Sequence, residues 1–224
     1  MDTHGIILLI IAALEFALAV YLFLTRSKGH VIYSYALFIL SVTIWVLGNG
    51  LYRIIQDDAT AFVWVRVLYF ASVLIAITFV YFSLSFPHLI RPIRLIHSLL
   101  LVAPALVFLY VLFFTNSLVS SISGQPGIRQ LSWGPFYHVF ALWFMLYFGW
   151  GIVNLLKRLP LTSGFQYWQL KTLLTGIIIS AVIGTTFNLI LPWFNGPQLF
   201  FLGTEGSSIW LGVTSYIVFS KRAT

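Results

Sequence analysis

The sequence predicts an all-α, polytopic membrane protein: a bundle of seven transmembrane helices with its N-terminus outside the cytoplasm and its C-terminus inside. Three observations lead to this fold class. Only 8% of the 224 residues are charged and 60% are hydrophobic, whereas about 25% charged residues are typical of a soluble domain. Seven apolar stretches reach the roughly 20 residues that a helix needs to cross a bilayer. The basic residues gather in alternate connections between these stretches.

The seven stretches follow one another along a chain that we interpret as a single domain, residues 1–224. The segment before the first stretch lacks the basic region and cleavage site of a signal peptide, so we expect this stretch to be a retained span. The longest connection, residues 115–135, contains Ser, Gly, Gln and Pro and is predicted to be an extracellular loop. The predicted spans are residues 5–24, 31–52, 61–86, 95–114, 136–156, 167–191 and 199–220.

The orientation follows from the distribution of lysine and arginine, because positively charged loops are retained in the cytoplasm. With the N-terminus outside, nine of the twelve basic residues fall on the cytoplasmic side and three on the outer side. An odd number of spans then places the C-terminus inside. The inner set is Arg26, Lys28, Arg91, Arg94, Lys157, Arg158, Lys171, Lys221 and Arg222; the outer set is Arg53, Arg66 and Arg129.

Composition and motifs argue against several function classes. The net charge of +7 does not indicate a nucleic-acid partner, because the basic residues punctuate apolar runs and do not cluster on one polar face. The chain has no cysteine, and its five histidines lie at different depths, so we expect no metal site and no cofactor. A retinal photoreceptor needs a lysine within the last span. The last span has no lysine before Lys221 at its cytoplasmic end, so we do not expect a photoreceptor. No nucleophile and base share one depth, so we expect no catalytic residue.

Three ionisable residues lie at membrane depth, where each is a candidate functional residue because its desolvation is costly. Glu15 falls near the middle of the first span, about 15 Å deep by helical rise. Arg66 and Glu205 fall in the outer halves of the third and seventh spans, where an ion pair between them would offset their desolvation. Alternatively, Arg66 reaches the interface or holds helices together, and Glu15 is a buried protonated acid.

Further polar residues fall in the same outer layer and outline a pocket that opens to the outside. Asn49 and Asn188 lie near the outer ends of the second and sixth spans, and the seventh span begins with a run of small residues at 203–208. This run favours either close helix packing or a kink that lines a ligand site. The predicted ligand-binding residues are Asn49, Arg66, Tyr69, Asn188, Glu205 and Ser208, with Glu15 as a separate intramembrane acid.

Several segments are similar to one known family. They are Tyr81–Pro87, Arg91 and Arg94, Pro104, Thr162–Gly164, Gln169–Lys171, Gly176, Gly184, Asn188 and Leu191–Pro192, then Gly206–Ile209, Ser215–Val218 and Lys221–Arg222. In order and spacing they resemble the N-terminal seven-transmembrane sensor region of bacterial membrane histidine kinases. The resemblance implies an input module without catalytic residues that acts on a cytoplasmic output domain. The chain ends at Thr224 without a phosphoacceptor or ATP-binding segment, so we expect either an excised sensor region or a stand-alone protein of this type.

The leading hypothesis is therefore a signal-input module of a two-component system in the cell membrane. We expect it to detect an extracellular or membrane-borne ligand, a small molecule or a lipid, and to transmit the signal through the last span to a cytoplasmic kinase or other output domain. A homodimer is also compatible with this hypothesis. One alternative is a small-solute or ion carrier that uses Glu15; another is an assembly partner that packs through Gly48/Gly50 and Gly203/Gly206.

Overall fold

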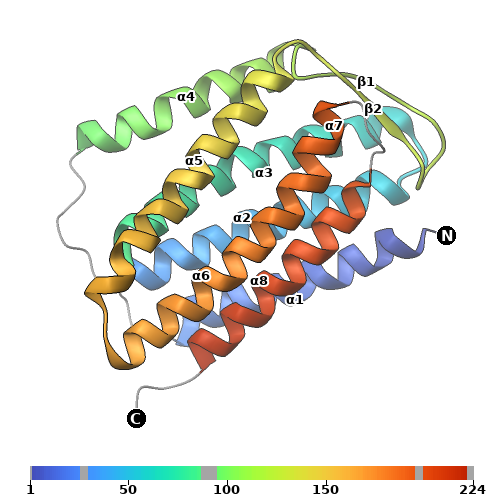
Figure 1. The fold of residues 1–224 in the computed structure, drawn as a ribbon. Coiled ribbons are helices and arrows are strands. Elements are labelled where there is room, and N and C mark those ends of the chain that lie inside the picture. Colours follow the sequence, from blue (N-terminus) through green and yellow to red (C-terminus); the bar gives the residue numbers. More distant parts are fainter. Residues whose placement is uncertain (1, 26–29, 87–94, 195–198, 221–224) are drawn as a thin grey trace.

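The computed structural model describes residues 2–25, 30–86, 95–194 and 199–220 (Figure 1). In this part of the chain, each of the seven predicted spans coincides with a long helix, to within a few residues. The elements are α1 (Thr3–Thr25), α2 (His30–Ile54), α3 (Asp58–Ser85), α4 (Leu95–Phe114), β1 (Val119–Ser123), β2 (Gln130–Trp133), α5 (Tyr137–Arg158), the 3₁₀ turn η1 (Leu159–Leu161), α6 (Gly164–Thr185), the π-helical turn η2 (Thr186–Ile190), α7 (Leu191–Trp193) and α8 (Phe200–Ser220).

Five helices in the described residues are long and apolar enough to cross a membrane: α1, α2, α3, α5 with η1, and α6 with η2 and α7. Large apolar side chains on the outer faces of the helices are exposed, such as Leu14, Leu106 and Leu146. A bundle with an apolar exterior fits a lipid environment, because a soluble surface exposes few such patches. The fold is therefore all-α and membrane-like.

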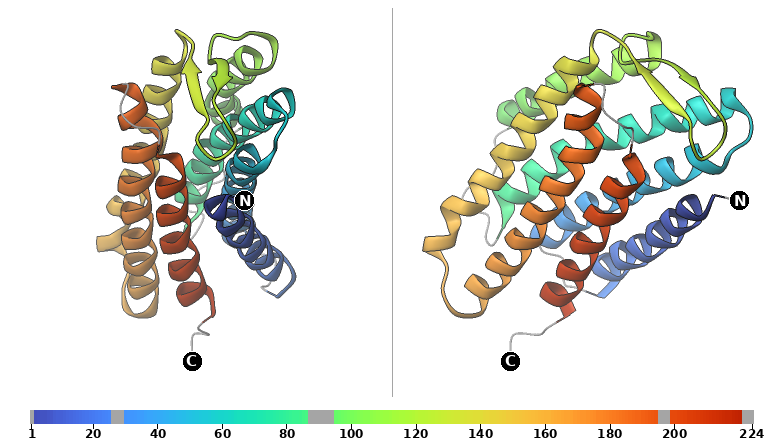
Figure 2. Two further views of the ribbon diagram at one scale, coloured as in Figure 1. Left: turned by 90° about the vertical axis from the view of Figure 1, so that its right-hand side faces the viewer. Right: turned by 45° about the vertical axis from the view of Figure 1, so that its right-hand side comes forward.

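The helices pack in a bundle in which α2 and α3 are central. The helix α2 packs against α1, α3 and α8, α3 packs against α4 and α5, and α6 packs closely along α8. Figure 1 and Figure 2 show the N-terminus and the β1–β2 hairpin at one end, and the α5–α6 connection and the C-terminal end of α8 at the other. We call these the outer and inner ends.

Of the nine basic residues predicted on the cytoplasmic side, six (Arg26, Lys28, Arg91, Arg94, Lys221 and Arg222) lie outside the described residues. Lys157 and Arg158 lie at the end of α5, and Lys171 follows early in α6. These three residues lie toward the inner end, whereas Arg53, Arg66 and Arg129 lie toward the outer end. The membrane orientation itself stays a prediction.

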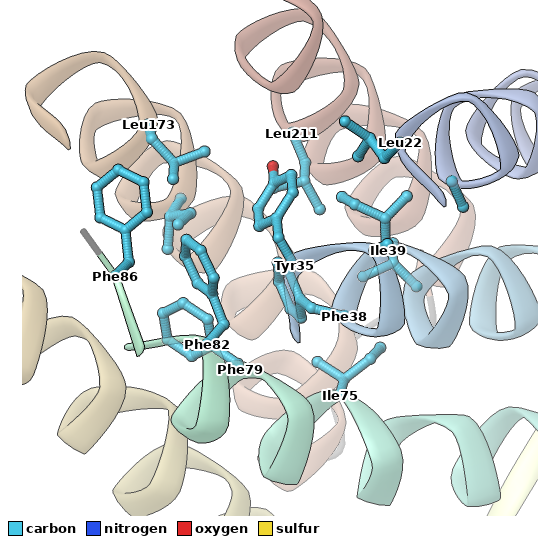
Figure 3. Close-up of a cluster of buried hydrophobic side chains, with 14 of the residues drawn as sticks. Leu22, Tyr35, Phe38, Ile39, Ile75, Phe79, Phe82, Phe86, Leu173 and Leu211 are labelled. Atoms are coloured by element: carbon cyan, nitrogen blue, oxygen red, sulfur yellow. The ribbon is translucent and has the colours of Figure 1, made fainter. Parts of the chain in front are cut away.

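The core consists of two hydrophobic clusters that share the central helices. The first joins α1, α2, α3, α6 and α8, with Tyr35, Phe38, Phe79 and Phe82 fully buried (Figure 3). The second lies toward the outer end, around Tyr69, Phe140 and Tyr137. Aromatic rings pack edge to face in this second cluster, as in the pair of Tyr69 and Phe140 with centroids 5.5 Å apart.

Local sequence signals explain where α3 begins and ends. Asp57 precedes the helix with an extended backbone, and its carboxylate accepts a hydrogen bond of 2.7 Å from the backbone N–H of Thr60. This is the capping arrangement that satisfies one of the free N–H groups of a first turn. At the other end Phe86 has an extended backbone (ψ 140°), the conformation favoured for a residue that precedes a proline.

A proline also explains the π-helical turn η2. Pro192 has no N–H, so the carbonyl oxygen of Asn188 four residues earlier loses its usual helical donor. The Tyr137 hydroxyl donates to this region, 3.4 Å from the carbonyl oxygen of Asn188 and 3.3 Å from that of Leu189. A single π-helical turn inside a helix is often found at a functional site.

The predicted extracellular loop contains a β-hairpin, which the loop residues alone did not indicate. The strands β1 and β2 pair antiparallel, with Ile122 opposite Leu131 and an irregularity between Val119 and Ser121. The turn folds back over the outer end, where the N–H of Gly127 donates to the carbonyl oxygen of Arg53 at 3.0 Å. The hairpin therefore covers the outer end of α2.

Candidate functional site

An apolar cavity of about 110 Å³ extends from the outer part of the bundle to its middle, and we call it the inner cavity. Its wall comes from α2, α3, α5, α6, η2 and α8, together with Leu131 of β2. Three α8 residues contribute: Phe200, Ser207 and Leu211. Further large apolar side chains in the wall include Phe38, Trp45, Leu68, Ile75, Phe140, Phe144, Phe148 and Ile177.

Few polar groups face the inner cavity, and most of their hydrogen-bonding capacity is used within the bundle. Asn49 donates from its amide nitrogen to Thr204 Oγ1 at 2.5 Å. Ser72 and Asn188 hydrogen-bond to carbonyl oxygens of their own helices, of Leu68 at 3.0 Å and of Gly184 at 3.0 Å. Two polar atoms of the lining residues make no hydrogen bond within the described part of the chain. Asn49 Oδ1 and the Tyr52 hydroxyl are buried without a partner among the described residues.

A second, more polar cavity of about 190 Å³ adjoins the first at the outer end, and we call it the outer cavity. Three residues line both cavities: Asn49, Tyr52 and Phe200. The hairpin covers the outer cavity with residues 127–130. The two residues that carry the unpartnered polar atoms, Asn49 and Tyr52, therefore lie where the cavities meet.

Arg53, which lines the outer cavity, is neutralised by the N-terminal segment. Its Nε and Nη2 donate to the two carboxylate oxygens of Asp2 at 2.6 and 3.1 Å, and its guanidinium lies 4.7 Å from the ring centre of Phe201. Burial raises the pKa of the Asp2 carboxyl group, but the hydrogen bonds and charge of Arg53, the N–H of Gly5 and the charge of His4 together outweigh burial and hold this pKa below the ordinary value of 3.8. The pair connects the chain just before α1 to the end of α2.

The lowered pKa of Asp2 predicts a pH-dependent contribution to stability. Since the folded-state pKa lies below the unfolded one, the stabilisation is present above about pH 3.8 and is lost as the pH falls through the folded-state value. We expect Asp2→Asn to lower the free energy of unfolding by about 1 kcal/mol near neutral pH. Thermal unfolding in detergent at a series of pH values measures the difference between the two proteins. A difference that persists unchanged at the most acidic pH would contradict this assignment.

Three of the predicted site residues, Asn49, Tyr69 and Asn188, line the inner cavity. Depth along the helices placed Asn49 and Asn188 in one layer, and in the structure these two residues and Tyr69 line a common space.

Arg66 and Glu205 line neither described cavity, and they do not form the ion pair that the sequence suggested. Arg66 Nη2 donates to Asn116 Oδ1 at 3.3 Å, and its guanidinium lies 5.0 Å from the ring centre of Phe62. Glu205 Oε1 lies 3.0 Å from His4 Nδ1. The reason is packing: α8 lies against α1, α2 and α6, so Glu205 meets the start of α1.

Ser208 and Glu15 belong to a different buried polar group, between α1, α2 and α8. The Ser208 hydroxyl lies beside the Glu15 carboxyl group, yet neither makes a well-formed hydrogen bond to any described residue. Nearby, the Tyr35 hydroxyl is hydrogen-bonded to Ser215 (Figure 3 shows the hydroxyl of Tyr35 directed away from the aromatic cluster). Glu15 lines neither cavity, so it has no described contact with the space that a solute would occupy.

Polar contacts connect α8 to the helices around the inner cavity. Ser180 of α6 donates to the carbonyl oxygen of Ser207 at 2.7 Å. At Gly176 the α6 backbone approaches α8 so closely that a Cβ atom would overlap the side chain of Thr214. Together with the Asn49–Thr204 hydrogen bond, these contacts make α8 part of the same packed unit as the cavity wall.

Sequence reasoning did not single out Tyr52 or Phe200 as site residues. The sequence contained a signal for Tyr52, because Tyr52 follows Asn49 by three positions and therefore lies on the same face of the helix. Phe200 had none, since one more phenylalanine in an apolar run is indistinguishable from a core residue. In the part of the chain that the structure describes, no three His, Asp or Glu side chains gather into a metal-binding group.

Residues 7–220 match the family described as the N-terminal 7TM region of histidine kinase. The chain belongs to this family. A comparison with curated proteins gives no significant match. As a histidine-kinase 7TM region, the chain is a multi-pass membrane protein and a sensor input module of signal transduction, which the family associates with a histidine-kinase output domain.

Proposed function

We propose that this 7TM region detects a small molecule or lipid in the inner cavity and transmits its presence through α8 to a cytoplasmic kinase output. In this proposal the N-terminus faces the exterior of the cell, the C-terminus faces the cytoplasm, and the ligand reaches the cavity from the outer end. The nine-to-three distribution of basic residues supports the orientation in the cell membrane.

One observation carries the proposal: α8 forms part of the cavity wall. A molecule in the inner cavity would contact Phe200, Ser207 and Leu211 directly. A ligand shifts a conformational equilibrium only by its differential affinity for two states. Direct contact with the helix that would move provides such a difference, because α8 cannot change its position without changing the shape of the cavity.

Filling the cavity with a side chain tests this coupling. Ser72 faces the inner cavity from α3 and hydrogen-bonds only to its own helix among the described residues, so Ser72→Leu places a larger apolar group in the space. Thr175→Leu is the matched control, because Thr175 makes the same kind of bond, to the carbonyl oxygen of Lys171, but is exposed on α6.

The absence of cysteine allows spin labels at two introduced cysteines, at Leu24 of α1 and Tyr216 of α8, which are 80% and 64% exposed. Double electron–electron resonance then reports the distance between the inner ends of these helices. We expect Ser72→Leu to shift this distance by about 1–2 Å, the size of typical helix movements in switching proteins, and Thr175→Leu to leave it unchanged.

The same two variants, placed in a histidine kinase that contains this region, test the output. We expect Ser72→Leu to change the autophosphorylation rate and Thr175→Leu to preserve it. An unaltered distance together with an unaltered rate in a folded Ser72→Leu protein would show that the cavity does not control α8.

A further inference from the structure

The junction of the two cavities has the chemistry of a binding site for one particular group. Asn49 and Tyr52 line both cavities, and the Oδ1 atom of Asn49 and the hydroxyl group of Tyr52 are buried without a partner among the described residues. A buried polar atom without a hydrogen bond is costly, and such an atom in a native structure calls for an explanation. Asn49 Oδ1 only accepts, whereas the Tyr52 hydroxyl both donates and accepts. A hydroxyl group satisfies both atoms, because it donates one hydrogen bond and accepts another.

The charges around the outer cavity argue against a charged head group. Arg53 is paired with Asp2. Arg129 uses all five of its N–H donors: its Nε and Nη2 bind Asp58, and the remaining donors bind backbone carbonyl oxygens. An anion would meet two arginines whose charges are already balanced by Asp2 and Asp58, and it would face the side-chain amide of Asn49. A cation would find no carboxylate in the described walls of either cavity.

The inner cavity itself selects for a small apolar body. Its wall is almost entirely aromatic and aliphatic, and its volume of about 110 Å³ is somewhat smaller than that of an engineered protein cavity that takes up benzene. A ring or a short alkyl chain of about six carbons matches this space. A longer ligand would extend past Tyr52 and Phe200 into the outer cavity.

We infer that the adjoining cavities bind an uncharged amphiphile whose hydroxyl group lies between Asn49 and Tyr52 and whose ring or short alkyl chain fills the inner cavity. This assignment rests on the proposed sensor function and specifies the chemical class of its ligand. It gives a role to the two unpartnered polar atoms, which the packing of the helices alone does not explain.

Photolabelling with an alcohol of this size tests the assignment on the intact chain in lipid nanodiscs. The probe is a diazirine analogue of 1-hexanol, with adducts located by mass spectrometry. We expect saturable adducts on inner-cavity residues such as Phe144 and Leu68, and only non-saturable adducts on lipid-facing residues such as Leu106. Unlabelled 1-hexanol should displace the probe at least about tenfold better than hexanoate or hexylammonium, since these charged heads lack a partner at the junction.

A conservative substitution tests the hydroxyl contact. Tyr52→Phe deletes only a hydroxyl without a described partner, so we expect the protein to fold and the apparent affinity for the probe to fall about five- to tenfold, the loss of one hydrogen bond. Tyr110→Phe is the matched control, because its hydroxyl lies on the exposed face of α4, and we expect no change.

The outcomes separate this inference from the proposed function. Adducts confined to lipid-facing residues, equal displacement by the charged competitors, or an unchanged affinity in Tyr52→Phe would each overturn the assignment of an uncharged amphiphile. If in that case Ser72→Leu still shifts α8, the sensor function stands and its ligand has different chemistry. If the alcohol binds as expected but Ser72→Leu leaves α8 and kinase activity unchanged, the cavity binds an amphiphile without serving as the sensor.

Discussion

Replacing Arg129 with alanine is expected to lower the free energy of unfolding by about 3 kcal/mol, because three backbone carbonyl oxygens lose a charged hydrogen-bond donor. The Arg129 side chain is only 1% exposed. Its Nη1 binds the carbonyl oxygens of Tyr52 and Ile55 at 3.1 and 2.6 Å, and its Nη2 binds that of Gln56 at 2.8 Å. These oxygens belong to the end of α2, where the carbonyls lack helical donors and the helix dipole is negative.

Arg66→Ala is the matched control, because Arg66 is an arginine near the same end with one described hydrogen bond, 3.3 Å long, and one ring contact. We expect it to cost less than about 1 kcal/mol. Unfolding by sodium dodecyl sulfate in mixed micelles, followed by tryptophan fluorescence, measures both variants. Equal losses in the two would mean that the bonds of Arg129 to α2 do not stabilise the fold.

Gly134→Ala is expected to cost about 3 kcal/mol, at the upper end of the usual penalty for overpacking. Gly134 lies at the base of the hairpin, where its N–H donates to the carbonyl oxygen of Leu118 at 3.1 Å. A Cβ atom there would overlap the backbone carbonyl of Ser117 and lie 2.8 Å from that of Asn116. No side-chain rotation relieves a contact with backbone, so the segment at Asn116 and Ser117 and the segment at Gly134 must move apart.

The control for this substitution is Gly149→Ala. A Cβ atom at Gly149 meets nothing within 4 Å, and alanine is favoured over glycine inside a helix by about 1 kcal/mol. We therefore expect this variant to be as stable as the wild type or slightly more so in the same unfolding measurement. A Gly134→Ala protein with wild-type stability would show that the base of the hairpin tolerates a side chain.

Both substitutions act on the cover of the proposed binding site. Arg129 connects the hairpin to the end of α2, next to the backbone of Tyr52, and Gly134 allows the two segments at the base of the hairpin to approach each other closely. The outer cavity lies under the same hairpin. Displacing the hairpin would uncover the junction of the two cavities, so we expect the amphiphile site to depend on the β1–β2 hairpin as well as on the helices.

The helices were predictable from the sequence because the signals that specify them are local. A run of about 20 apolar residues is long enough to cross a bilayer wherever it falls in the chain, and the predicted ranges match the helices within a few residues. Asp57 and Pro87 mark the limits of α3 by rules that involve only adjacent residues. The β-hairpin was not predictable, because Ser- and Gly-rich segments pair as strands only where a neighbouring structure supports them.

The candidate site was predictable only in part. Depth along a helix follows from counting residues, and this placed Asn49 and Asn188 in one layer. Depth does not give the rotation of a helix about its axis or the identity of its neighbour. Arg66 and Glu205 share a depth with that layer but face Asn116 and His4, respectively.

By itself, the sequence determined a seven-helix membrane protein, the separation of its basic residues and its membership in the histidine-kinase 7TM family, because apolar length, charge and motif order are properties of consecutive residues. The tertiary structure alone decided the partners of Arg53, Arg129 and Glu205, and the cavity junction at Asn49 and Tyr52. These depend on which helix faces lie together, and contacts between residues far apart in the chain arise only when the whole bundle packs.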